Sequence, residues 1–97
     1  MLTEHGRDFV LQSTLGLSDA GLLRDNLLLV ITAGDDLYLD ASGVERISTP
    51  CIQVLYAAAL EVEAAGGRFH IVSPSQIVAD AFHDLGMAIP FKRWSSE

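Results

Sequence analysis

The first element that the pattern of apolar and polar residues predicts is a strand near the amino terminus. Phe9 to Leu15 alternates apolar and polar residues in part, and turn residues follow at Gly16 and Ser18. Residues 1–7 would add a further short strand if His5-Gly6-Arg7 turns the chain.

An amphipathic helix is predicted next. Apolar residues recur at three- and four-residue spacing from Ala20 to Ile31, and Ser18-Asp19 supplies an N-cap and an acidic first turn. The helix is expected to end near Gly34.

A buried strand and a second helix occupy the middle of the chain. Leu37 to Ala41 is short, apolar and bounded by turn residues, and Val44 to Ile47 carries the chain onward. Proline suits the first helical position, so Thr49 is predicted as the N-cap of a helix that stops at Gly66-Gly67. Its expected inner face is Ile52, Leu55, Tyr56 and Ala59.

A third strand and a third helix follow. The strand is predicted over Arg68 to Val72. Ser73 and Gln76 form a predicted capping box at the start of a helix over Pro74 to Leu85. Gly86 closes that helix. Its expected inner face is Val78, Ala81, Phe82 and Leu85.

The alternation of strands and helices predicts one α/β domain over residues 1–97. Short connections between a strand, a helix and the next strand call for parallel strands and right-handed crossovers. Phe91 to Trp94 has no clear period, which predicts a final strand or an irregular cover.

Composition narrows the classes of partner. Among 97 residues, 49% are hydrophobic and the net charge is −7, which predicts a folded domain that repels nucleic acid and anionic membrane surfaces. A single cysteine and the absence of a signal-peptide pattern favour the cytoplasm. No apolar run is long enough to insert in a membrane, and the oligomeric state stays open.

Few residues offer chemistry for catalysis or cofactor binding. No glycine-rich phosphate loop is present, and His5, His70 and His83 lie too far apart in sequence to suggest a metal site. Cys51 in the first turn of a helix could be a nucleophile or a packing residue. Because no histidine lies near it in the sequence to act as a base, packing is favoured. No enzyme activity, metal or cofactor is predicted.

Two positions carry a functional interpretation beside a structural one. Asp40 ends the central strand, where α/β folds bind ligands, but its carboxylate can also cap the local loop. Ser48-Thr49-Pro50 begins a helix, where a hydroxyl can accept a phosphoryl group or serve as an ordinary cap.

The segment Leu39 to Leu55 resembles the signature of STAS domains, the fold of bacterial anti-sigma-factor antagonists. There a strand ends in Asp-x-Ser-x-Val, and an Ile-Asp-Ser/Thr turn leads into a helix. The resemblance continues through Glu63 to Arg68, Ile71 to Ser75 and Leu85 to Met87. It implies a four- to five-stranded mixed sheet with about three helices packed on it.

The resemblance also implies a function. Such antagonists dock on a kinase that binds the sigma factor, and phosphorylation at the start of the second helix breaks the contact. The acceptor by position is Thr49, with Ser48 as the alternative. The implied partner-binding residues are Asp40, Ser42, Ser48, Thr49, Pro50 and Gln53.

This sequence departs from the STAS pattern beside the acceptor. Ser48 replaces an acid, and Pro50-Cys51 replaces a small Ser-Gly or Ala-Gly pair. Two readings follow from the resemblance: a phosphorylation switch that binds a histidine-kinase-like regulator, or a constitutive, non-phosphorylated subunit of a chemotaxis-type signalling or lipid-transport complex.

Overall fold

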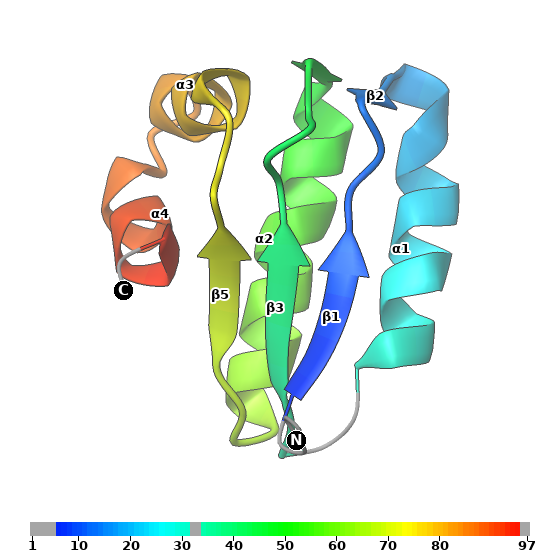
Figure 1. The fold of residues 1–97 in the computed structure, drawn as a ribbon, viewed down its shortest axis with the longest axis vertical. Coiled ribbons are helices and arrows are strands. Elements are labelled where there is room, and N and C mark those ends of the chain that lie inside the picture. The colour runs from blue at the N-terminus through cyan, green and yellow to red at the C-terminus, as the bar shows by residue number, and fades with distance from the viewer. Residues whose placement is uncertain (1–5, 32–33, 96–97) are drawn as a thin grey trace.

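The computed structural model describes residues 6–31 and 34–95. Its centre is a parallel sheet of β1 (Gly6–Val10), β3 (Asp36–Asp40) and β5 (Phe69–Val72), in the order β1-β3-β5 (Figure 1). The predicted turn at His5-Gly6-Arg7 is wrong for its described part, because Gly6 and Arg7 lie within β1. Residues 1–5, and with them most of the predicted extra strand, lie outside the described residues.

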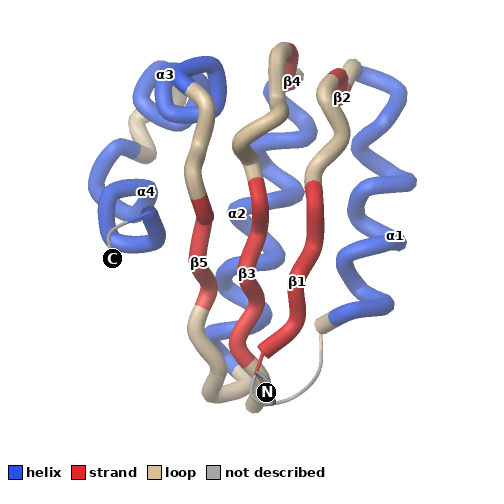
Figure 2. Tube along the Cα trace, viewed as in Figure 1, coloured by secondary structure: helices blue, strands red, loops and turns tan. Residues whose placement is uncertain are grey.

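A second small sheet pairs β2 (Thr14–Leu15) with β4 (Arg46–Ile47), also in parallel (Figure 2). The predicted strand from Phe9 to Leu15 is therefore two strands, since the chain leaves β3 after Leu11 and joins β4 instead. All strand pairs of the described residues are parallel, so the sheets there are parallel rather than mixed as expected.

The helices number more than the three expected. The described chain has four α-helices and one short 3-10 helix, which are η1 (Leu17–Asp19), α1 (Ala20–Val30), α2 (Thr49–Ala64), α3 (Gln76–Asp84) and α4 (Ala88–Ser95). Helix α1 ends at Val30 rather than near Gly34, because Ile31 already has extended backbone angles.

The helices cover one face of the sheet. Figure 1 shows α2 behind the strands, α1 beside β1, and α3 and α4 beside β5. Side chains on β3 alternate between buried and half-exposed, as expected where one face meets a core. The largest fully buried side chains are Phe82, Leu27, Leu37, Leu39, Ile52, Leu55, Val62, Val78 and Cys51.

Two helix starts differ from the predicted ones. The N-cap of α2 is Ser48, and Thr49 is already its first residue. The N-cap of α3 is Ser75, whose hydroxyl accepts from the Val78 amide at 3.4 Å. The predicted capping box at Ser73 fails because Ser73 takes a left-handed conformation, with φ of 50°, that extends the loop.

The carboxyl-terminal segment forms helix α4, so the expected final strand or irregular cover is wrong. Trp94 is buried and packs its ring edge-on against Phe69 at 5.3 Å and against Phe82 at 6.2 Å. Its indole N–H donates to Oε2 of Glu63 on α2 at 3.1 Å. Helix α4 thereby covers the end of the core beside β5. Leu85, predicted to face inward, is instead 38% exposed.

The turn before β5 depends on two glycines. Gly66 has a φ of 96°, which a residue with a side chain rarely adopts, and it ends α2. A Cβ on Gly67 would overlap the backbone carbonyl of Asp35. These glycines allow the chain to pass closely beneath β3 and start β5. No helix in the described residues is long and apolar enough to cross a membrane.

Candidate functional site

The predicted site residues lie at the carboxyl-terminal end of the parallel strands. Figure 1 shows β3 pointing toward the end of the molecule at which α1 and α2 both begin. Asp40 is the last residue of β3, and Thr49 is the first of α2. Crossovers between parallel strands return each helix start to this end of the sheet, which is why α/β folds bind ligands there.

Asp40 organises the loop that follows β3. Its Oδ1 accepts two hydrogen bonds from Ser42, one from the backbone N–H at 2.9 Å and one from the hydroxyl at 2.7 Å. The backbone N–H first and the hydroxyl second lower the pKa of the Asp40 carboxyl below its usual value, because both stabilise the charged form. The loop-capping interpretation of Asp40 therefore describes its contacts, and the side chain stays accessible beside them.

Ser48 holds the start of α2 against the loop before η1. Its hydroxyl donates to the carbonyl oxygen of Gly16 at 3.1 Å, and its backbone N–H donates to that of Leu15 at 2.8 Å. The Cys51 thiol, which is fully buried, donates to the same Gly16 oxygen at 3.5 Å. Ser48 and Cys51 therefore have structural contacts, in agreement with the packing interpretation of Cys51.

Thr49 differs from both of these neighbours. It is exposed, and no hydrogen bond of the described chain engages its hydroxyl. The Thr49 and Cys51 amides donate to no protein acceptor in residues 6–31 and 34–95, and Pro50 has no N–H to donate. Gln53 is exposed one turn further along α2. The helix start therefore presents a free hydroxyl next to free amides and the positive end of a helix dipole.

The site falls into two groups. One is the Asp40–Ser42 pair in the loop after β3, and the other is the first turn of α2 with Ser48, Thr49, Pro50 and Gln53. In the described part of the chain no hydrogen bond joins the two groups. They share an end of the sheet, and a partner would have to bridge them.

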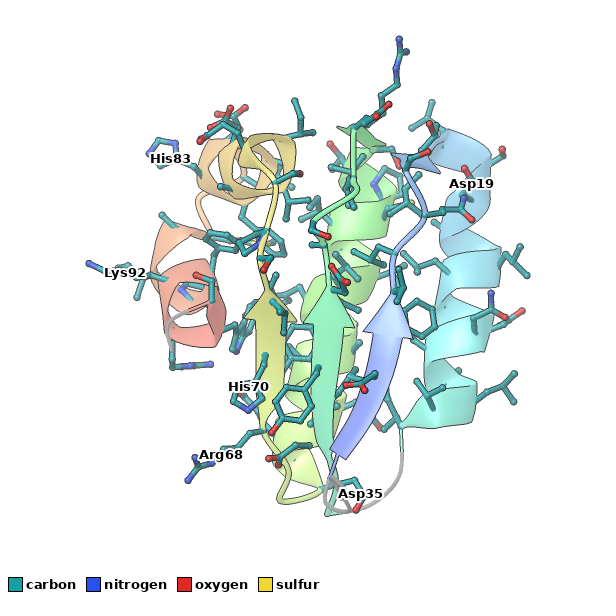
Figure 3. The ribbon with its side chains drawn as sticks, viewed as in Figure 1. Asp19, Asp35, Arg68, His70, His83 and Lys92 are labelled. Carbon is teal, nitrogen blue, oxygen red and sulfur yellow. The ribbon has the colours of Figure 1, made fainter. Side chains whose placement is uncertain are left out.

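Sequence reasoning missed the contribution of the Gly16 turn. The Asp19 carboxylate accepts the Gly16 N–H at 2.7 Å, which orients the carbonyl that Ser48 and Cys51 use. Figure 3 labels Asp19 near the start of α1. The sequence signal was an acid at the third position after Gly16, from which a side chain can reach back to the N-cap amide of a helical turn. Its contact with α2 bridges more than 30 residues of sequence, so only the fold reveals it.

The two histidines in the described residues lie on different elements. His70 lies on β5 with its ring stacked on Tyr38 at 4.6 Å, and His83 is exposed on α3. His5 lies outside the described residues. Within those residues, no group of three or more His, Cys, Asp or Glu side chains could hold a metal ion.

A comparison with protein families decides the identity of the fold. The family model described as "Mlab, STAS domain" matches residues 3–90. The chain belongs to the STAS domain family. No curated protein matches it. The family match covers both halves of the candidate site, the loop after β3 and the start of α2, and STAS domains are generally binding modules rather than enzymes.

Proposed function

We propose that this STAS domain docks on a serine-kinase or histidine-kinase-like regulator through the Asp40–Ser42 loop and the first turn of α2, and that phosphorylation of Thr49 releases it. The observation that carries the proposal is the free Thr49 hydroxyl at the exposed start of a 16-residue helix. Asp40 and Ser42 in the loop after β3, together with Ser48, Pro50 and Gln53 at the start of α2, complete the proposed docking surface.

Thr49 suits the role of acceptor better than Ser48 does. Phosphorylating Ser48 would remove its hydrogen bond to Gly16 and force a charged group into a partly buried position. A phosphate on Thr49 meets solvent on one side and the free Thr49 and Cys51 amides on the other. The domain can therefore carry that phosphate without unfolding.

The switch would act through charge at the docking surface. A phosphate adds a charge of about −1.5 to −2 at pH 7. A domain with a net charge of −7 already repels acidic surfaces, and the added charge must be desolvated when a partner covers it. Phosphorylation therefore weakens docking by local repulsion and desolvation rather than by a change of fold.

The proposal is tested by replacing Thr49 with glutamate and titrating the domain against its copurified regulator by calorimetry. Thr49→Glu is expected to weaken docking by about tenfold or more, the range of a charge placed in an interface. Asn26→Asp is the matched control, because it adds the same charge to an exposed position in the middle of α1. Equal affinity of Thr49→Glu and wild type would refute the switch.

A direct measurement of the modification separates the two STAS readings. Intact-mass spectrometry before and after phosphatase, with peptides mapped across residues 47–68, should find a removable phosphate on Thr49. Lack of modification together with one fixed copurifying partner would select the constitutive subunit of a chemotaxis-type signalling or lipid-transport complex. Ser48 favours this second function, since it replaces the usual acid and is committed to the contact with Gly16.

A further inference from the structure

The face of the sheet opposite the helices is covered by no described element. In Figure 1 the helices lie behind and beside the strands, and the near face is bare. On β3, Leu37 and Leu39 are buried toward the helices, whereas Asp36, Tyr38 and Asp40 alternate with them and are half-exposed. We call this second set the bare face, together with its neighbours on the flanking strands, Asp8, Val10, His70 and Val72.

The register places these side chains in two rows across the strands. In one row Asp8 lies beside Tyr38, and Tyr38 lies beside His70. The Tyr38 and His70 rings stack nearly parallel, with 4.6 Å between their centroids. Figure 3 shows His70 on the near side of β5. The stack fixes both rings side by side, so this row presents a rigid aromatic surface next to a carboxylate.

The second row joins Val10, Asp40 and Val72. Val10 is 72% exposed and Val72 is 40% exposed, so two apolar side chains border the Asp40 carboxylate in solvent. Parallel sheets nearly always have both faces covered, because their crossovers place helices on each side. A bare parallel face with exposed valines and an aromatic stack therefore indicates a surface that another molecule covers.

Charge defines the chemistry of that molecule. Asp8, Asp36 and Asp40 contribute three carboxylates to the bare face, in a chain with a net charge of −7. A second copy would bring the same carboxylates against them, and nucleic acid would be repelled as well. We propose that the bare face docks a protein segment in which lysine or arginine side chains alternate with small apolar ones.

Such a segment matches the bare face group by group. Its cationic side chains would reach the carboxylates, while its apolar side chains would cover Val10, Val72 and the Tyr38–His70 stack. Aromatic rings and exposed valines supply the apolar contact area, and the carboxylates set the register and the salt dependence. This surface shares Asp40 with the proposed docking site but does not include Thr49, so it extends the proposed function to a second contact.

The probe is a short peptide in which lysine and valine alternate, followed by the amide resonances of the protein in NMR. The expected shifts lie on β1, β3 and β5, at Asp8, Val10, Tyr38 and His70, and they disappear in high salt. Asp8→Lys should weaken peptide binding by about fivefold, the effect of one reversed contact charge. Asp84→Lys is the control with the same change in charge, on an exposed position of α3.

Three outcomes would overturn the proposal. Equal weakening by Asp8→Lys and Asp84→Lys would show attraction to the whole acidic protein, and shifts confined to the helices would place the peptide elsewhere. Concentration-dependent dimerisation that Val10→Ser abolishes would assign the bare face to a second copy. Thr49→Glu should leave peptide binding unchanged, so failure of the phosphorylation switch is distinguishable from failure of this proposal.

Discussion

Helix α4 should be essential to the core, and Trp94 is the residue through which this can be tested. Its side chain is 2% exposed and contacts the rings of Tyr56, Phe69 and Phe82. Replacing it with alanine removes the ring from all of these contacts and leaves a cavity between α4, α2 and β5. We therefore expect Trp94→Ala to behave as a core mutation rather than as a change at a chain end.

The size of the effect follows from burial and hydrogen bonding. Truncating a fully buried tryptophan to alanine typically costs about 3–5 kcal/mol in free energy of unfolding. Trp94→Phe retains most of the ring but loses the hydrogen bond to the Glu63 carboxylate, which should cost about 1–2 kcal/mol. Against a total stability of about 5–15 kcal/mol for a domain, the alanine variant removes a large share.

Urea unfolding followed by circular dichroism measures both variants, with Lys92→Ala on the exposed side of α4 as control. A loss of about 3–5 kcal/mol corresponds to a fall in Tm of about 12–40 °C for a domain of this size. Lys92→Ala should change stability by less than about 0.5 kcal/mol. A cost below about 1 kcal/mol for Trp94→Ala would show that α4 does not close the core.

Two further predictions concern the candidate site. The pKa of the Asp40 carboxyl should lie below the usual value for an aspartate in an NMR pH series, so its contribution to stability is present above the unfolded-state pKa and is lost as the pH falls through the folded-state pKa. Ser42→Ala should raise the Asp40 pKa, because it removes one of the two donors, and an unchanged pKa would contradict the assignment of that bond. Cys51 is 0% exposed, so Ellman's reagent should modify it at least about 100-fold more slowly in the native protein than in denaturant. Rapid modification of the folded protein would reopen the nucleophile interpretation.

The segment around Asp40 allowed both its secondary structure and its family resemblance to be predicted from the sequence. The short apolar run from Leu37 to Ala41, the turn residues that bound it and the proline at the start of α2 all predicted their elements from neighbouring residues. The resemblance of the same segment to STAS domains was confirmed by the family match over residues 3–90. Sequence could identify these features because each depends on residues close together in the chain.

The errors arose where long-range contacts override local preference. Ser48 rather than Thr49 occupies the N-cap position of α2, where its hydroxyl donates to the Gly16 carbonyl instead of accepting from a helix amide. The strand predicted from Phe9 to Leu15 breaks because Ser13 bonds to Glu45 and Arg46 in another part of the chain. Helix α4 has only eight residues and contains Pro90, so it is a weak local signal, and the buried contacts of Trp94 stabilise it.

The sequence by itself determined the α/β class, the parallel crossovers and the positions of Asp40 and Thr49 at helix and strand ends. These follow from apolar periodicity, glycine and proline signals and strand order, which need no tertiary information. Only the tertiary structure decided that Thr49 is free while Ser48 and Cys51 share the Gly16 carbonyl, and that one sheet face is left bare. Those features depend on contacts between segments that are far apart in the sequence, and the packing of the whole core determines these contacts.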